Sequence, residues 1–395
     1  MRQSALGELL DMKHNVLLIF LIFVAGVLFR LWFISLAPQP FMGDQTEYEW
    51  YAAKIFLHPQ MLESFSFRSY PYPLFLATVY KFVGFGNHEA IFFLQAILDA
   101  FSGVMVFLMT GSWIAFILYQ INPFTSGYVG VILSEVLSIF FITATILFGA
   151  FFVKKPKFAT GFLFGLAAGL AAETRNAAFL WAAIPIGLAY LFIRSKKYFF
   201  AILLGVIVTI IYPLYVNWRD YKEISITTVD SIFARELWNG AILKTLPPFA
   251  HDLNIAGLRE MYMEFYSERN PGRTSDERKA IAKKYMNSAF SIIKNDPIDY
   301  IKVRLDKMWY MWQKENVFFY EEPGFNQHKA YTYALNLAIL VLAAFGLWRA
   351  RRNWLWWTII GTVIYGTLVF SITHAEYRLT IPFYPLLVIA ASWAF

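Results

Sequence analysis

The stretch 16–36, VLLIFLIFVAGVLFRLWFISL, is an apolar run of the length that a membrane-spanning helix needs. Similar runs recur to the last residue, and hydrophobic residues make up 58% of the 395 residues against 15% charged. This composition is typical of a polytopic membrane protein and argues against a soluble one. The first run is too long for a signal-peptide core and no small-residue cleavage site follows it, so we expect it to be retained.

Ten apolar stretches are expected to cross the membrane as helices, near 15–36, 89–109, 112–131, 133–153, 159–174, 177–193, 198–216, 332–348, 354–372 and 379–395. With the N-terminus inside, this count puts the basic loops 154–157, 194–197 and 349–352 all on the cytoplasmic side, where Lys and Arg are enriched. The sequence therefore predicts a multi-pass plasma (inner) membrane protein. Its net charge of +7 lies largely in these loops and at the N-terminus, and it indicates no nucleic-acid partner.

The same count defines three regions, namely an N-terminal transmembrane module (1–216), an outer loop region (217–331) and C-terminal transmembrane helices (332–395). In the first outer loop, 37–88, segments 48–57 and 73–83 are expected to form interfacial helices. In the long loop, Asp296 followed by Pro297 predicts the start of an amphipathic helix on the outer leaflet. Within the span 159–174, glycines at 161, 165 and 169 predict close packing against another helix.

Most of the interesting polar residues fall on the predicted outer face. Asp44 and Glu47 lie in Gly43-Asp44-Gln45-Thr46-Glu47-Tyr48, just after the first span. The same face collects further charged residues: Arg68, Glu135, Arg175, His374, Glu376 and Arg378. A carboxylate can take a proton from an acceptor hydroxyl, and guanidinium groups match the oxygens of a lipid phosphate.

Each of these residues also has a purely structural interpretation. Asp44 with Glu47 can cap a helix, and Glu135 can do so after Ser134. Arg175 and Arg378 can extend from helix ends to the membrane interface, and Glu376 can pair with Arg378. These alternatives remain open at the level of sequence.

Other features point away from several chemistries. The chain has no cysteine, which excludes disulfides and thiolate sites, and it has neither a G-x-S-x-G elbow nor an H-E-x-x-H helix. His374 and Glu376 are too few to predict a metal site, so no metal or other cofactor is indicated. Asp99, within the second span, is interpreted as structural, bonded to Gln95 or Ser102, protonated, or facing a cavity.

Five motifs in the same order resemble the GT-C superfamily of membrane glycosyltransferases, closest to the dolichyl-phosphate-mannose protein mannosyltransferase and aminoarabinose lipid A transferase branch. They are Gly43-Asp44, Tyr70-Pro71-Tyr72-Pro73, Asn122-Pro123 with Ser134-Glu135, Glu173-Thr174-Arg175, and Glu376-Tyr377-Arg378. The resemblance implies an all-α fold of about ten transmembrane helices with interfacial helices in the first outer loop.

The resemblance to the GT-C superfamily also implies inverting transfer of a sugar from a polyprenyl-phosphate donor to a glycan, lipid or protein acceptor at the outer face. By the same resemblance, Asp44 is the catalytic base, and Arg175 and Arg378 lie near the donor phosphate, with Tyr70 among the substrate-binding residues. The family often has Asp-Glu where this chain has Asp44-Gln45, so the role of the second acid is absent here or passes to Glu47.

Two other functions fit part of the pattern. A flippase or transporter of lipid-linked saccharides would carry charges along a path through the spans, whereas here the charges gather at one face. A non-catalytic accessory subunit with the same fold is the other alternative. A partner subunit is also compatible with the sequence, since the acceptor has to be recognised by the long loop or by another protein.

Overall fold

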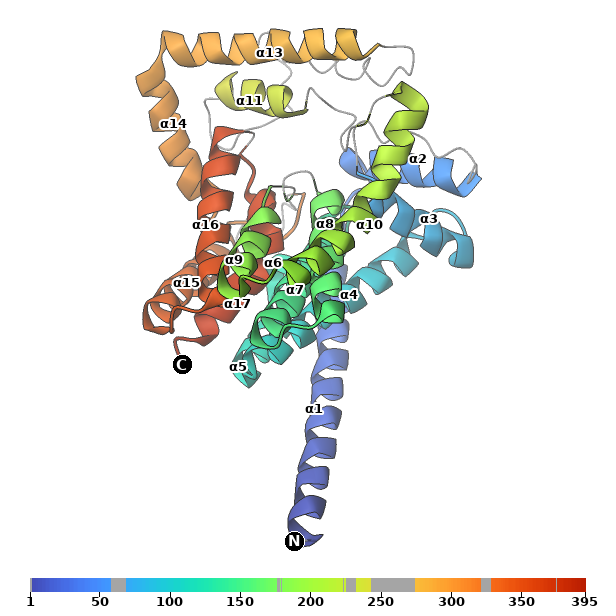
Figure 1. The fold of residues 1–395 in the computed structure, drawn as a ribbon, viewed down its shortest axis with the longest axis vertical. Coiled ribbons are helices and arrows are strands. Elements are labelled where there is room, and N and C mark those ends of the chain that lie inside the picture. The colour runs from blue at the N-terminus through green and yellow to red at the C-terminus, as the bar shows by residue number, and fades with distance from the viewer. Residues whose placement is uncertain are drawn as a thin grey trace.

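The computed structural model describes residues 2–57, 69–175, 178, 180–222, 224, 232–242, 274–320, 328–373 and 375–395. Within these ranges every regular element is helical, as the sequence predicts. Figure 1 shows a bundle of helices below and a separate layer of helices above it, with the N-terminal helix extending downward from the bundle.

Six helices in this part of the chain are long and apolar enough to cross a membrane. They are α1 (Arg2–Ser35, apolar from Val16), α4 (His88–Thr110), α7 (Glu135–Lys154), α10 (Lys196–Tyr221), α15 (Lys329–Arg349) and α16 (Trp354–Ile372). Three more of the ten expected spans are shorter apolar helices: α8 (Phe158–Thr174), α9 (Ala183–Ile193), and the run formed by the 3₁₀ helix η3 (Tyr377–Phe383) with α17 (Tyr384–Ser392). The chain is therefore a multi-pass membrane protein by its helices.

The expected continuous span at 112–131 is wrong. The chain forms α5 (Trp113–Gln120), breaks, and then makes the single turn α6 (Pro123–Ser126). Asn122 causes the break, because its side-chain oxygen accepts the Phe124 N–H at 2.8 Å, as an N-cap does. Pro123 then starts the next turn, where a missing N–H costs nothing.

The loop 37–88 contains the two expected helices, each beginning earlier than predicted: α2 (Asp44–Leu57) and α3 (Pro71–Val83). Both lie across the upper end of the bundle (Figure 1). Glu49 of α2 fixes them together, since its Oε1 accepts from the Tyr80 hydroxyl at 2.9 Å and lies 2.6 Å from His88 Nε2. The start of α2 is thus anchored on both α3 and α4.

The glycines of α8 permit a close approach to α10, as predicted. A Cβ on Gly165 would lie 1.9 Å from the Ile202 backbone oxygen, and one on Gly169 would lie 2.2 Å from Thr209 Oγ1. Gly205 of α10 is equally tight against the Phe162 backbone oxygen, at 2.2 Å. This packing sets the C-terminal end of α8, which contains Glu173 and is capped by Arg175, directly beside α10.

A buried ion pair joins three helices inside the bundle. Arg30 Nε of α1 lies 2.6 Å from Asp99 Oδ2 of α4, and both side chains are fully buried. Asp99 also accepts from the Tyr119 hydroxyl of α5 at 2.8 Å and from Thr125 Oγ1 at 3.1 Å. The structural interpretation of Asp99 is thus supported, but the partners expected for it, Gln95 and Ser102, bond elsewhere.

The upper layer consists of α11 (Ile232–Ile242), α13 (Ser275–Asn295) and α14 (Pro297–Tyr310). Asp296 caps α14 as predicted, accepting the Asp299 N–H at 3.0 Å. Helices α11 and α13 pack through a small apolar core of their own, formed by Ala234, Leu237, Trp238, Ala241, Tyr285 and Ala289. This core is separate from that of the bundle.

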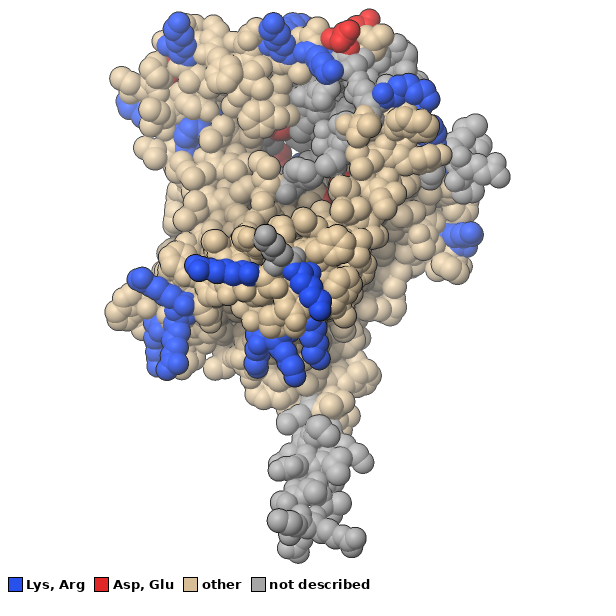
Figure 2. All heavy atoms as spheres, viewed as in Figure 1, with Lys and Arg blue, Asp and Glu red and all other residues tan. Residues whose placement is uncertain are grey.

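Lysines and arginines gather around the lower end of the bundle, and a broad belt with few charges separates them from the upper layer (Figure 2). The loops that join α7 to α8, α9 to α10 and α15 to α16 carry exposed basic residues. This distribution agrees with the one-sided basic loops that the sequence predicts.

Candidate functional site

The centre of the candidate site is an ion pair between the first outer loop and the segment after α16. Arg378 Nη1 donates to Asp44 Oδ2 at 3.0 Å, although 334 residues separate them in sequence. Arg378 Nε bonds the carboxylate of Glu376. All three side chains are half-buried, so solvent screens the pair only in part.

Local contacts of α2 explain why Asp44 is held at this position. Gly43 adopts a left-handed φ of 61°, which a glycine tolerates, and this turn leads directly into α2. Gln45 is buried, donates to the Pro40 oxygen at 2.7 Å and accepts the Ile132 N–H at 2.9 Å. A glutamate could not make both bonds when ionised, so an amide side chain is required at this position.

The second ion pair lies where α7 begins and α8 ends. Arg175 Nη1 is 3.2 Å from Glu135 Oε1, and the Glu135 side chain is almost fully buried. The Tyr48 hydroxyl of α2 donates to Ser134 Oγ at 3.0 Å, which ties α2 to the start of α7. Arg175 Nη1 makes no hydrogen bond to any described residue, because its contact with Glu135 lacks hydrogen-bond geometry.

Charge links the two pairs into one group. Burial by itself would lower the pKa of the Arg378 guanidinium, but the charges of Glu376, Asp44 and Glu135 raise it well above its ordinary value. Arg378 is therefore cationic at any physiological pH. We call Asp44, Glu135, Arg175, Glu376 and Arg378 the carboxylate–arginine cluster.

The segment that precedes the C-terminal helices covers one side of the cluster. Arg378 lies over the ring of Phe319, 4.9 Å from its centroid, which is a cation–π arrangement. The neighbouring Tyr320 hydroxyl donates to the Met42 oxygen at 2.8 Å, and its backbone N–H donates to Gln39 Oε1 at 2.7 Å. The segment that precedes α15 therefore contacts the residues just before α2, a contact that no sequence pattern indicated.

The remaining predicted site residues lie in different places. Glu47 is half-buried in the first turn of α2, one turn after Asp44. Tyr70 is buried at the start of α3 and points to α10, where its hydroxyl donates to the Thr209 oxygen at 3.0 Å. Arg68 and His374 lie outside the residues that the structure describes.

Glu173 is a polar residue of the site region that the sequence analysis did not select. It lies in the last turn of α8, is 8% exposed, and its Oε1 has no hydrogen-bond partner in the described part of the chain. A buried unpaired carboxyl oxygen is rare enough to require an explanation. The sequence could have indicated Glu173 as a site residue, because it is an acid at the end of an apolar span, two residues before Arg175.

A second group of buried charges lies in the upper layer. Arg304 donates to the Gly240 oxygen at 2.6 Å and to the Ile372 oxygen at 3.2 Å, so it bonds carbonyls near the C-terminal ends of α11 and α16. Lys307 is fully buried beside it, 3.4 Å from the same Gly240 oxygen. Arg304 and Lys307 thus point into the protein, whereas the apolar Ile298, Ile301 and Leu305 of the same helix are exposed.

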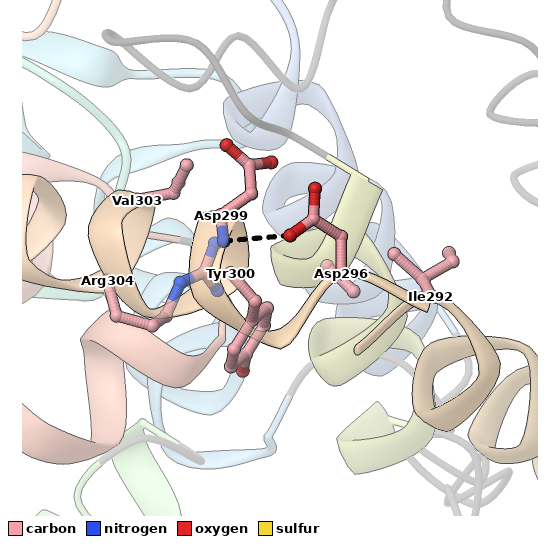
Figure 3. Close-up of a pocket in the computed structure, with 7 residues that line it drawn as sticks. Ile292, Asp296, Asp299, Tyr300, Val303 and Arg304 are labelled. Atoms are coloured by element: carbon pink, nitrogen blue, oxygen red, sulfur yellow. Dashed lines mark hydrogen bonds between the residues drawn. The ribbon is translucent and has the colours of Figure 1, made fainter. Parts of the chain in front are cut away.

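A small pocket opens beside Arg304. Figure 3 shows Asp296, Asp299, Tyr300 and Arg304 around it, with the Asp296 carboxylate bonded to the Asp299 N–H. Acids, a guanidinium and an aromatic ring lie together here, but the buried cations are already bonded to helix carbonyls. The pocket therefore lies between α11, α13 and α14, and none of the residues that line it belongs to the carboxylate–arginine cluster.

Across the ranges the structure describes, no three His, Asp or Glu side chains are grouped as metal ligands. The carboxylate–arginine cluster has the chemistry to accept a proton at a carboxylate and to bind an anion at a guanidinium. No protein-family model matches this sequence, and no curated protein matches it either.

Proposed function

We propose that the protein is a membrane glycosyltransferase that moves a sugar from a polyprenyl-phosphate donor to a glycan, lipid or protein acceptor. The observation that carries the proposal is the Asp44–Arg378 contact, because it joins a candidate base to a candidate phosphate-binding group. These residues belong to the first and last of the five motifs that resemble the GT-C superfamily. The reaction takes place at the outer face of the plasma (inner) membrane, and the N-terminus is cytoplasmic.

The proposed reaction is an inverting displacement. Asp44 accepts the proton of the acceptor hydroxyl, whose oxygen forms a bond to the anomeric carbon. The bond from that carbon to the phosphate oxygen breaks, and the electron pair leaves with the polyprenyl phosphate. Arg175 and Arg378 stabilise the negative charge on the leaving phosphate, which is the electrostatic part of catalysis.

The Asp44–Arg378 ion pair of the resting protein sets the order of donor binding and proton transfer in this mechanism. While Arg378 bonds Asp44, this carboxylate is engaged by the guanidinium group. A donor phosphate competes with Asp44 and Glu376 for the guanidinium, so donor binding frees Asp44 to accept a proton. The base is then active only when the donor is in place.

The transporter alternative is less well supported. A translocation path needs charges that a substrate can reach within the membrane. Arg30 and Asp99 are fully buried and bonded to each other at 2.6 Å, and Tyr119 and Thr125 also donate hydrogen bonds to Asp99. These features are those of a packing contact between helices.

The experiment that tests the proposed function uses a strain that lacks the gene. Mass spectrometry of its glycolipids and glycoproteins is compared after rescue with wild type, Asp44→Asn or Asp306→Asn. Asp306 is an exposed acid on α14, so it controls for the loss of one carboxylate at the outer face. We expect wild type and Asp306→Asn to restore the same missing glycan and Asp44→Asn to leave it missing. No difference in glycans between the deletion and wild-type strains would contradict the function.

A further inference from the structure

Glu173 is a buried acid that the proposed mechanism does not yet use. Its side chain is on the last turn of α8, and Oε1 has no hydrogen-bond partner among the residues described. Arg175, two residues later, is in contact with Glu135 rather than with Glu173. The nearby cation therefore does not neutralise this carboxyl group.

One residue that interacts with Glu173 is Tyr70, which precedes α3. Burial, and after it the charge of Glu173 and the nearby Tyr212, raises the pKa of the Tyr70 phenol well above its ordinary value. The Tyr70 hydroxyl gives its one proton to the Thr209 oxygen at 3.0 Å, and its ring lies 4.6 Å from that of Tyr212. Since a hydroxyl has a single proton to donate, Tyr70 cannot also satisfy the Glu173 carboxyl group.

Two physical effects oppose a negative charge on Glu173. Burial disfavours the ionised form of a carboxyl group, and the C-terminal end of a helix carries a partial negative charge. Among the described residues, Tyr70 from α3 interacts electrostatically with Glu173, the Tyr212 ring of α10 lies beside that of Tyr70, and Glu135 of α7 is engaged by Arg175. Glu173 therefore holds a proton more readily than an exposed glutamate, and in its protonated form it is a hydrogen-bond donor.

A neutral acid suits the charge balance at this site. Three carboxylates, Asp44, Glu135 and Glu376, contact two guanidinium groups, Arg175 and Arg378. A further negative charge would repel an incoming phosphate, whereas a protonated carboxyl group adds a donor without adding charge. Glu173 lies at the same end of α8 as Arg175, whose Nη1 likewise makes no hydrogen bond to a described residue.

We propose that the protonated Glu173 carboxyl group donates a hydrogen bond to the donor phosphate that Arg175 binds. This inference rests on the proposed function, because it concerns the same polyprenyl-phosphate ligand. Binding of the phosphate and ionisation of Glu173 then exclude each other. The affinity for a lipid phosphate falls as pH rises and Glu173 loses its proton.

Farnesyl phosphate, a short polyprenyl phosphate, is the probe, and its binding to the purified protein in detergent is measured by calorimetry from pH 5.5 to 9. We expect the affinity of wild type to fall as Glu173 ionises, by up to about tenfold per pH unit. Glu173→Gln keeps a neutral donor at every pH, so we expect it to bind as wild type does at low pH and to lose less at high pH. Glu173→Leu removes the donor and should bind about tenfold more weakly at low pH.

The ligand is the same in every titration, so its own ionisation cancels in the comparison between wild type and Glu173→Gln. Identical pH profiles for these two proteins, or unchanged affinity in Glu173→Leu, would overturn the role of Glu173 while leaving the proposed function intact. Failure of wild type to bind farnesyl phosphate, or equal binding of farnesol, would contradict the proposed function itself. Glu173→Gln is close in shape to glutamate, so the test survives if Glu173→Leu does not fold.

Discussion

Arg378 donates a hydrogen bond to Asp44 at 3.0 Å and also holds Glu376, so one guanidinium group joins two carboxylates in the resting protein. The proposed base is thus restrained until another anion competes for Arg378. This relationship predicts that changes at Arg378 affect both donor binding and the state of Asp44.

Arg378→Lys should lower transfer by on the order of a hundredfold, because a single ammonium group cannot present the planar fork that contacts both carboxylates and a phosphate. Arg378→Gln should lower it further, because the cation is lost. Initial rates at varied donor concentration measure the effect, and the KM for the donor should rise in both variants. Arg351→Gln, at an exposed basic loop, is the control, and an unchanged KM in Arg378→Gln would remove Arg378 from the donor site.

Gln45→Glu should destabilise the protein by about 1–3 kcal/mol, since it removes the donor to the Pro40 oxygen and buries a charge next to Asp44. The relevant measurement is the apparent melting temperature in detergent. Gln45→Met, which loses both hydrogen bonds but adds no charge, separates the two causes. A melting temperature for Gln45→Glu equal to that of wild type would mean that the Gln45 bonds do not fix the start of α2.

Arg30→Leu should be strongly destabilising, by about 3–5 kcal/mol, because it leaves the buried Asp99 without its cation. The double variant Arg30→Leu with Asp99→Leu should recover much of this loss, because no uncompensated charge remains. Thermal unfolding of the two single variants and the double variant gives the coupling between the residues. Additive effects would contradict a direct pair.

The buried Lys307 predicts a pH-dependent stability of the upper layer. Burial, and after it the charge of Arg304, lowers the pKa of Lys307 to about 7. Between pH 7 and the pKa of an unfolded lysine, the unfolded chain binds more protons than the folded one, so stability rises with pH. Below pH 7 both states are protonated and this dependence ends.

Hydrogen exchange of α11 and α14 at pH 6.5 and 8.5, corrected for the intrinsic exchange rate, measures this effect. We expect greater protection at pH 8.5 in wild type and a smaller difference in Lys307→Met, which fills the same space without a titrating group. Lys302→Met, at an exposed position on the same helix, is the control. An equal pH dependence in Lys307→Met and wild type would show that another group titrates.

Much of the fold could be predicted from hydrophobic length and loop charge. These signals are strong because a bilayer requires long apolar helices and the loop charges set their orientation. The start of α14 was predicted because Asp296 and Pro297 form a local cap. The span at 112–131 was not, because its hydrophobicity conceals the Asn122–Pro123 break, which depends on one side-chain hydrogen bond.

The candidate site was predictable only as far as a shared membrane face. The predicted topology placed Asp44, Glu135, Arg175 and Arg378 on one side of the membrane. Which of these residues pair with one another depends on how the helices pack, and local sequence does not encode this packing. The contact of Tyr320 with Met42 is of this kind, as it joins two distant loops. The Arg30–Asp99 ion pair could have been predicted from the sequence, because a charge within a span needs a partner and Asp99 is an acid within another span.

The most direct test of the central claim is the rate of sugar transfer by purified Asp44→Asn with its donor and acceptor. If Asp44 is the base, the single-turnover rate should fall about 10²–10⁴-fold, while affinity for the donor stays within a few-fold of wild type. Asp306→Asn should transfer at the wild-type rate. Transfer by Asp44→Asn at the wild-type rate would contradict the account.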